Sequence, residues 1–330
     1  MTVLVTGAAG FIGFHVANAL LDRGEPVLGL DNLNTYYDPK LKQARLERLE
    51  ARKGFKFVFA DLGRIQALEA AVHDELGAID RIVHLAAQAG VRYSIENPQA
   101  YLQSNYAGHL NVLELARKID GLKHLVYASS SSVYGGSTRV PFALDDPVDR
   151  PTSLYAASKR ANELASIAYA GLYRLPQTGL RFFTVYGPWG RPDMAYYRFV
   201  ADTLAGRKIP VFGEGVQSRD FTYIDDIVAG LLAALDRPPR VDVKGANSEP
   251  HRLFNLGSDT PTTLNRMIEI VESVCGRKAV REALPAEPAD VPATWADISE
   301  SRRALDFAPR TTLEDGIRRF VAWYRDYAGL

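Results

Sequence analysis

The stretch Thr2-Val3-Leu4-Val5-Thr6-Gly7-Ala8-Ala9-Gly10-Phe11-Ile12-Gly13 decides the fold of this chain. Its first five residues predict a short apolar strand, and its glycines follow in a G-x-x-G-x-x-G turn. A helix to about Arg23 and a second strand over 26–31 complete a βαβ unit. The glycines let backbone N–H groups approach a pyrophosphate at the positive N-terminus of the helix. We therefore expect the turn to bind a dinucleotide through Gly7, Gly10, Phe11, Ile12 and Gly13.

The second strand ends in an acidic residue where such units bind a ribose. Asp31 follows Gly13 by 18 residues, and its carboxylate can accept hydrogen bonds from the adenosine ribose hydroxyls. A carboxylate there repels a 2′-phosphate, which favours NAD over NADP. A glycine triplet alone is also explained by a turn that needs small residues. The order of strand, triplet, helix, strand and acid, however, predicts nucleotide binding.

The alternation of strands and helices continues beyond this unit. Strands are predicted over 55–60, 81–85 and 122–128, with helices over 64–76 and 96–118 between them. This order predicts an α/β fold with a Rossmann-like, doubly wound parallel sheet. Ligand sites in such sheets gather at the carboxyl ends of the strands.

The pattern changes from about residue 184. Strict alternation ends there, and the later elements are a surface loop around Pro238-Pro239 and 242–251 and helices over 194–205, 224–236, 263–275 and 312–328. We expect an NAD-binding domain over 1–183, to which later segments return. A smaller C-terminal α/β domain over 184–330 would bind the substrate.

Composition narrows the classes of function. The 330 residues carry 39 basic and 39 acidic side chains, so no net charge favours nucleic acid or an anionic membrane. The apolar run 3–21 is interrupted by glycines and polar residues and has no basic segment before it, which is typical of a buried strand and helix. The single Cys275 is expected to be a buried small hydrophobe, and His15 and His84 are expected to be structural. No spacing of metal ligands is present, and we expect a cytoplasmic protein.

Tyr155 and Lys159 form the candidate catalytic pair. They lie in a predicted helix over 153–174, where a spacing of four places both side chains on one face. A free tyrosine has a pKa of about 10, and a nearby ammonium favours the phenolate and lowers that pKa. The pair can therefore serve as a general acid/base for a hydroxyl. Because Tyr-x-x-x-Lys also occurs by chance in helices, the pair gains its meaning from the nucleotide-binding end.

Taken together, these features resemble the extended short-chain dehydrogenase/reductase superfamily over nearly the whole chain. Within that superfamily the chain is most similar to the UDP-glucuronate 4-epimerases. Long stretches are more specific than the glycine motif, and those that carry the resemblance are Asp31-Asn32-Leu33-Asn34-Thr35-Tyr36-Tyr37-Asp38-Pro39, His84-Leu85-Ala86-Ala87-Gln88-Ala89-Gly90-Val91-Arg92, Arg181-Phe182-Phe183-Thr184-Val185-Tyr186-Gly187-Pro188-Trp189-Gly190-Arg191-Pro192-Asp193-Met194-Ala195 and Ser218-Arg219-Asp220-Phe221-Thr222-Tyr223-Ile224-Asp225-Asp226.

The resemblance implies roles at the cofactor end. Tyr155 would be the base, Lys159 would hold the nicotinamide ribose, and Ser130 would hydrogen-bond the sugar 4-hydroxyl. Lys40 would reach the adenosine ribose or phosphate. The other implied cofactor contacts are Asn32, Asp61 and Leu62 at the adenosine, and Leu85, Ala86 and Ala87 along the groove.

At the sugar end, Arg219 and Arg191 are candidates for the UDP pyrophosphate or the sugar carboxylate, because a guanidinium pairs with either anion. Surface ion pairing also explains such arginines. Asp290 would bind the uridine ribose, and Val211 would flank the uracil, although an apolar strand there is equally typical of core. The remaining implied substrate contacts are Arg92, Ser130, Ser131, Ser132, Tyr155 and Thr184.

The residues beside Ser130 favour one reaction of this superfamily. A hexuronic acid oxidised at C4 is a β-keto acid, which loses carbon dioxide readily. Similar decarboxylases carry glutamate where Ser132 stands, and similar 4,6-dehydratases carry an Asp-Glu pair at Ser131-Ser132, whereas both acids are absent here. This favours interconversion of UDP-glucuronate and UDP-galacturonate with bound NAD.

Three alternatives remain. They are a UDP-glucuronate decarboxylase, a 4-epimerase of neutral UDP-hexoses and a non-catalytic NAD-binding sensor. Thr184 disfavours the second, because similar galactose epimerases carry asparagine there. Sensors of this fold commonly lose the Tyr155/Lys159 pair.

The helices over 96–118 and 153–174 are long and apolar enough to form a subunit interface. In the similar enzymes a four-helix bundle joins two subunits. The resemblance therefore implies a homodimer that acts on a UDP-sugar.

Overall fold

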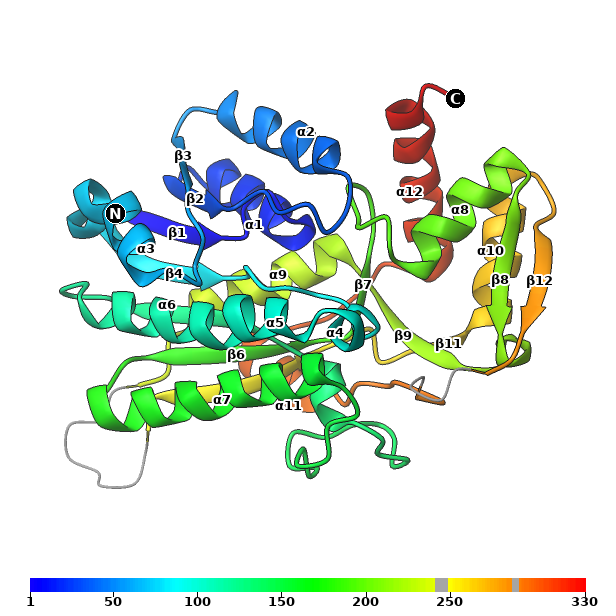
Figure 1. Cartoon of the computed structure of the whole chain (residues 1–330). Coiled ribbons are helices and arrows are strands. Elements are labelled where there is room, and N and C mark those ends of the chain that lie inside the picture. Colours follow the sequence, from blue (N-terminus) through cyan, green and yellow to red (C-terminus); the bar gives the residue numbers. More distant parts are fainter. Residues whose placement is uncertain (241–248, 287–290) are drawn as a thin grey trace. The chain divides into compact units, whose positions relative to one another are not determined.

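The computed structural model describes residues 1–240, 249–286 and 291–330 and divides the chain into two compact units (Figure 1). The first unit comprises 1–135, 147–181 and 228–254, and the second comprises 136–146, 182–227 and 255–330. Most of the predicted loop over 242–251 lies outside the described residues.

A seven-stranded sheet forms the centre of the first unit, in the order β10-β6-β5-β4-β1-β2-β3. The neighbours from β3 to β5 pair in parallel. The order of strands reverses between β1 and β4, where a doubly wound sheet opens its ligand crevice. The predicted Rossmann-like α/β class is confirmed. The strands are β1 (Thr2–Thr6), β2 (Val27–Asp31), β3 (Phe55–Phe59), β4 (Ile79–His84), β5 (His124–Ser130), β6 (Gln177–Phe182) and β10 (His251–Leu256).

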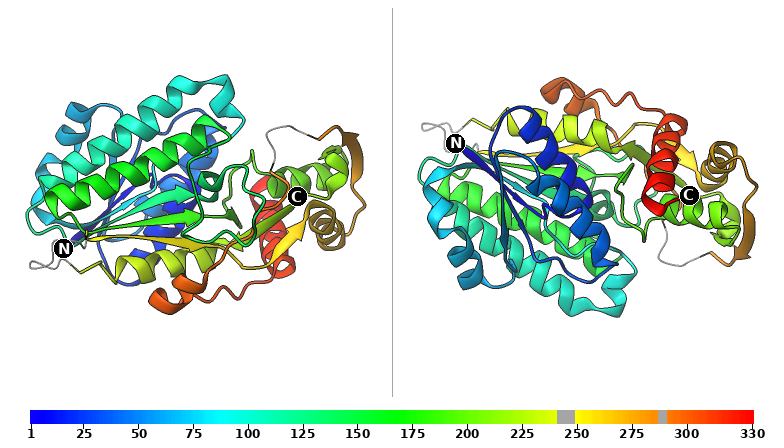
Figure 2. Two further views of the ribbon diagram at one scale, coloured as in Figure 1. Left: turned by 90° about the horizontal axis from the view of Figure 1, so that it is seen from below. Right: turned by 90° about the horizontal axis from the view of Figure 1, so that it is seen from above.

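Helices cover both faces of this sheet (Figure 2). One face carries α1 (Phe11–Asp22) and α2 (Pro39–Glu50), and the ion pair of Arg23 with Asp236, 2.8 Å long, joins the end of α1 to the end of α9 (Ile224–Leu235). The other face carries α3 (Ile65–Val72), which continues into the 3-10 turn η1 (His73–Ala78), together with α6 (Gly108–Arg117) and α7 (Leu154–Tyr173). Fully buried apolar side chains fill the space between this second face and the helices, among them Leu4, Leu68, Val112 and Leu125.

The predicted helix over 96–118 corresponds to three helical segments that follow one another without a gap from Pro98 to Arg117. The range 96–118 contains the end of α4 (Tyr93–Glu96), then α5 (Pro98–Tyr101), the π-helix η2 (Leu102–Ala107) and α6. The Asn97 side chain caps α5 by accepting a hydrogen bond from the Ala100 N–H at 3.3 Å. Pro98 takes the first helical position, where its missing N–H is not needed. The prediction of a helix over 96–118 is confirmed from Pro98 to Arg117, and only its start differs, because Asn97 and Pro98 end α4 and begin a new helix.

The second unit is smaller and contains mixed sheets. A three-stranded sheet has the order β11-β9-β7, and β12 pairs in parallel with β8. The aromatic rings of Tyr186, Tyr196 and Phe320 meet edge to face in its core. Cys275 is buried as expected. The elements are β7 (Thr184–Tyr186), α8 (Ala195–Ala205), β8 (Lys208–Phe212), η4 (Gly213–Gly215), β9 (Ser218–Tyr223), β11 (Pro261–Thr263), α10 (Leu264–Cys275), β12 (Val280–Leu284), α11 (Ser299–Leu305) and α12 (Leu313–Ala328), with η3 (Ser131–Tyr134) belonging to the first unit.

Candidate functional site

The glycine turn joins β1 to α1 and lies against the backbone that follows β4. Gly7 has a φ of 74°, and a Cβ at this position would come 2.8 Å from the Ala86 nitrogen. A Cβ at Gly13 would come 2.0 Å from the Gly7 carbonyl oxygen. The N-cap of α1 is Gly10, which brings no side chain to this helix end. The N–H groups of the first turn therefore suit an anion, and a pyrophosphate of NAD fits this site.

The carboxylate of Asp31 orders the chain around the end of β2. Its Oδ2 accepts a hydrogen bond from the Ala9 N–H at 3.1 Å, and its Oδ1 accepts one from the Leu33 N–H at 2.8 Å. Burial raises the pKa of Asp31, and the charge of Lys42 opposes this rise. Asp31 thus ties the strand end to the glycine turn.

Two basic residues of α2 approach this region, and neither was predicted. Lys42 donates from Nζ to the Asn34 carbonyl oxygen at 2.9 Å. Arg45 is fully buried and donates to the Ala9 carbonyl oxygen at 2.9 Å. The sequence suggested Lys40 instead. This residue is exposed, and its backbone N–H donates at 2.9 Å to the helix-capping carboxylate of Asp38. A spacing of three that places Lys42 and Arg45 on one face of α2 was the available signal.

The remaining predicted cofactor residues lie at the carboxyl ends of neighbouring strands. Asn32, after β2, donates to the Asp61 carboxylate, after β3, at 3.1 Å. The Ala86 N–H donates to the Thr6 hydroxyl at 3.2 Å, which joins the ends of β4 and β1. Leu62 is buried, whereas Leu85 and Ala87 are partly exposed. The residues predicted from β1, β2, β3 and β4 are therefore gathered along one edge of the sheet.

The candidate catalytic residues come from α7 and the end of β5. Lys159 is buried, and its Nζ donates to the Ala128 carbonyl oxygen at 2.9 Å. Burial lowers the pKa of Lys159 to about 8, and the charge of Glu163 opposes this shift. Ser130 is the last residue of β5, and its Oγ donates to the Ser132 hydroxyl and accepts from the Ser132 N–H, both at 3.2 Å.

An asparagine of the π-helix η2 fastens α7 to the loop after β4. Asn105 exchanges two hydrogen bonds with the backbone of Gln88, of 2.8 and 3.0 Å, and donates to the Ser158 hydroxyl at 2.9 Å. Ser158 in turn donates to the Tyr155 carbonyl oxygen at 2.7 Å. The ring of Tyr101 meets the ring of Tyr155 edge to face, with centroids 6.1 Å apart. The extra residue in the helical turn was not visible in the sequence, although such π-turns recur at functional sites.

Of the other predicted substrate residues, Arg92 is exposed at the start of α4 in the first unit. In the second unit, Thr184 begins β7, Arg219 lies in β9 and donates to the Ser218 carbonyl oxygen at 2.8 Å, and Val211 is buried where β8 pairs with β12. Arg191 forms a two-bond ion pair with Asp193, of 2.5 and 3.1 Å. Asp290 lies outside the described residues.

Residues 3–257 match the model of the NAD dependent epimerase/dehydratase family. The chain belongs to this family. The family's cofactor agrees with the glycine turn and with the acidic residue at the end of β2.

Named relatives narrow the comparison within the epimerase/dehydratase family. UDP-glucuronate 4-epimerase 4 of Arabidopsis thaliana is 47% identical, with 99% of this chain and 76% of the relative covered. A probable UDP-glucuronate 4-epimerase of Rhizobium meliloti is 46% identical, with 98% and 97% covered. Among solved structures, a UDP-glucuronic acid 4-epimerase of Bacillus cereus in complex with UDP-glucuronic acid and NAD is 33% identical. Its TM-score is 0.89, and 99% of this chain and 100% of that chain are covered.

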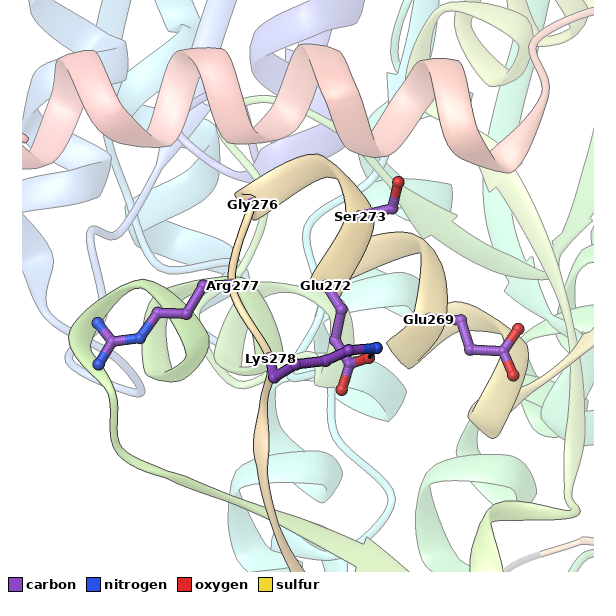
Figure 3. A pocket seen from close by; sticks show the side chains of 6 residues that line it. All are labelled: Glu269, Glu272, Ser273, Gly276, Arg277 and Lys278. Carbon is purple, nitrogen blue, oxygen red and sulfur yellow. Dashed lines mark hydrogen bonds and ion pairs between the residues drawn. The ribbon is translucent and has the colours of Figure 1, made fainter.

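A surface hollow of about 300 Å³ lies on α10 and is not part of the predicted functional site (Figure 3). Its lining includes Glu272 and Lys278, which pair at 2.7 Å, and none of the predicted site residues. In the part of the chain that the structure describes, no three His, Cys, Asp or Glu side chains are grouped to hold a metal ion. No helix of the described ranges is long and apolar enough to cross a membrane.

Proposed function

We propose that this chain is a UDP-glucuronate 4-epimerase that interconverts UDP-glucuronate and UDP-galacturonate with tightly held NAD. The observation that carries the proposal is the similarity to named UDP-glucuronate 4-epimerases over nearly the whole chain. The buried Lys159 on the helix that carries Tyr155, directly beside the end of β5, agrees with it.

The reaction removes a hydride from C4 and the proton from the C4 hydroxyl, and then returns the hydride to the opposite face of C4 and the proton to the C4 oxygen. Bound NAD supplies the acceptor and donor of the hydride. Tyr155 takes the proton of the C4 hydroxyl as a general base and returns it as a general acid. The Lys159 ammonium favours the phenolate, and the Ser130 hydroxyl hydrogen-bonds the C4 oxygen. Between the two transfers the 4-keto sugar turns in the site, so that C4 is inverted without net oxidation.

Two serines suit the task of holding the substrate carboxylate. The 4-keto intermediate loses carbon dioxide only when the breaking bond is aligned with the carbonyl π system. Ser131 and Ser132 begin the turn η3 after Ser130, are partly exposed, and offer hydroxyl donors but no acid. Hydrogen bonds from these donors keep the carboxylate out of that alignment. This supports epimerisation over decarboxylation and over dehydration, which needs a further acid and base.

The second unit is proposed to bind the UDP part of the substrate. Arg219 and Arg191 would contact the pyrophosphate, since a guanidinium pairs with two anionic oxygens. The ion pair of Arg191 with Asp193 would have to open for this role, which makes Arg219 the stronger candidate. Thr184, Val211 and Asp290 complete the proposed contacts of this unit.

We also propose a homodimer joined through η2, α6 and α7. Apolar side chains at intervals of four or eight residues are exposed on these helices, with Leu172 72% exposed. Exposed apolar rows of this kind mark protein interfaces. The side chains concerned are Leu102, Tyr106, Leu110, Leu164 and Leu172. Light scattering after gel filtration tests the state, and a monomer at micromolar concentration would refute it.

The activity is tested by proton NMR of UDP-glucuronate incubated with the protein. UDP-galacturonate should form without added NAD, and Tyr155→Phe should keep NAD but lose turnover. Exclusive formation of a UDP-pentose would support a UDP-glucuronate decarboxylase. Conversion of neutral UDP-hexoses alone would support a 4-epimerase of those sugars, and no conversion of any UDP-sugar would support a non-catalytic NAD-binding sensor. A cytoplasmic location stays a prediction that cell fractionation can test.

A further inference from the structure

A buried ion pair lies one helical turn beyond the candidate catalytic pair. Tyr155, Lys159 and Glu163 follow one another at intervals of four along α7. Glu163 is completely buried, and Arg181 of β6 meets both of its oxygens, with Nε 2.8 Å from Oε1 and Nη2 3.0 Å from Oε2. Arg160 donates to Oε2 at 3.1 Å. These charge-assisted bonds hold the carboxylate in one orientation.

The same carboxylate holds the end of β5. The Ser129 hydroxyl donates to Glu163 Oε1 at 2.7 Å. Ser129 stands between Ala128, whose carbonyl oxygen accepts the Lys159 ammonium, and Ser130, the proposed partner of the sugar hydroxyl. The strand end and α7 are therefore joined at two adjacent points, and a displacement of Ser129 moves both neighbours.

Burial favours the neutral form of Lys159, whereas the charge of Glu163 favours the ammonium. Burial lowers the pKa of Lys159 to about 8, and Glu163 opposes this. The other titratable groups near Lys159 are Tyr155 on its own helix, His84 of β4 and His109 of α6. Burial lowers the pKa of both histidines, to about 3 for His109, so that both are neutral at pH 7.

Glu163 itself is surrounded by groups that keep it ionised. Burial alone would raise the pKa of Glu163, but the hydrogen bonds and charges of Arg181, Ser129 and Arg160 outweigh burial and lower it. Tyr127 of β5 and His251 of β10 also face this carboxylate. Burial raises the pKa of Tyr127 and lowers that of His251 to about 4, so that both are uncharged at pH 7.

We propose that Glu163 is a positioning residue for the reaction, acting on Lys159 through its charge and on Ala128 and Ser130 through Ser129. The charge keeps Lys159 an ammonium at neutral pH, and the bond to Ser129 fixes the two groups of β5 that Lys159 and the substrate use. The inference rests on the proposed function, because Lys159 has a catalytic task only if Tyr155 transfers a proton. A pair that served folding alone would leave the titration of Lys159 and the pH profile unchanged once the protein was folded.

Three variants separate the effect of the Glu163 charge from the effect of its hydrogen bond with Ser129. Glu163→Gln keeps the size of the side chain and removes its charge, so the alkaline limb of the kcat–pH profile should move down by about one pH unit. Glu163→Asp keeps the charge, so the alkaline limb of its kcat–pH profile should lie at the wild-type pH. Ser129→Ala removes the hydrogen bond to Glu163, so kcat should fall about tenfold, while KM and the alkaline limb of the profile should not change.

A second readout needs no turnover. In protein labelled with ¹⁵N-lysine and loaded with NAD, the Nζ signal that Lys159→Met removes should titrate at lower pH in Glu163→Gln than in the wild type. Glu272→Gln is the matched control, because Glu272 is a buried acid of the second unit that also binds a lysine and a backbone N–H. This control should leave both the limb and the Lys159 signal in place.

The outcomes decide whether Glu163 positions the reacting groups or serves folding alone. A folded Glu163→Gln with the wild-type limb and the wild-type Lys159 titration would overturn the proposal. If Glu163→Gln does not fold, Ser129→Ala with unchanged kcat, or Glu163→Asp with a lowered limb, would overturn it instead. A protein that binds NAD but yields no UDP-galacturonate refutes the proposed function, while the Lys159 titration still decides the role of Glu163.

Discussion

The substitution Asp220→Asn in β9 should destabilise the second unit strongly. Asp220 is completely buried and accepts four hydrogen bonds. Its Oδ1 accepts from the Ser258 N–H at 2.6 Å and the Thr222 hydroxyl at 3.1 Å, and its Oδ2 accepts from the N–H groups of Asp259 and Ala296, both at 3.1 Å. One side chain therefore ties the strand that carries Arg219 to two other segments.

The size of the effect follows from these four donors. Asparagine has nearly the same shape but only one acceptor oxygen, so two of the donors would face an NH₂ group. A buried donor that loses its acceptor costs about 1–3 kcal/mol, so two should cost about 2–6 kcal/mol. Proteins are typically stable by only about 5–15 kcal/mol, and the loss should therefore be easy to measure.

Tryptophan fluorescence in urea is the appropriate assay. All three tryptophans, Trp189, Trp295 and Trp323, belong to the second unit, and Trp295 donates to the Asp259 carboxylate at 2.9 Å. The urea midpoint of Asp220→Asn should fall with an unchanged slope. Asp326→Asn at the exposed end of α12 is the control and should not shift the midpoint. A loss below about 1 kcal/mol for Asp220→Asn would refute the reasoning that the carboxylate satisfies these donors.

Four further changes test other parts of the molecule. Gly7→Ala should abolish NAD binding, because its Cβ would meet the Ala86 backbone at 2.8 Å; protein purified with full NAD would contradict this. Arg219→Ala should raise KM for the UDP-sugar about 10–100-fold through a lost charged hydrogen bond, and an unchanged KM would exclude that contact. Leu164→Arg should give a monomer in light scattering that still binds NAD, whereas an intact dimer would place the interface elsewhere. Acidification should lower the unfolding free energy, because His109 has a pKa of about 3 when folded and about 6.5 when unfolded, so only the unfolded chain gains its proton between these values. The slope is about 1.4 kcal/mol per pH unit for this residue, and His109→Gln should be less sensitive in a circular dichroism titration; equal slopes would refute the assignment.

The cofactor end could be predicted from the sequence because its signals are local. The strand, the glycine turn, the helix and Asp31 follow one another within 31 residues, and each has a composition that only a few conformations tolerate. The order of the sheet followed from the same alternation, since parallel strands need crossover helices. Even the break before α5 was signalled by Asn97 and Pro98, although the apolar pattern around them concealed it.

The supporting residues could not be predicted in the same way. Lys42 and Arg45 belong to a helix that is mostly polar, and only the folded chain brings them to Asn34 and Ala9. Asn105 is one polar residue in an amphipathic stretch, and its bonds to Gln88 and Ser158 span 17 and 53 positions. No spacing in the sequence encodes such contacts, because they depend on the packing of η2 against α7.

No role was predicted from the sequence for the two completely buried acids, Glu163 and Asp220. Among the acidic residues that the structure describes, Glu163 and Asp220 alone have no exposed surface. Each lies close to a residue that sequence patterns select, Glu163 four positions after Lys159 and Asp220 next to Arg219. A carboxylate removed from water is tolerated only where donors surround it, and at both places the donors belong to the segments that carry functional groups. Buried acids of this kind therefore hold in place the residues that bind and react, whereas sequence motifs reveal only the residues that bind and react.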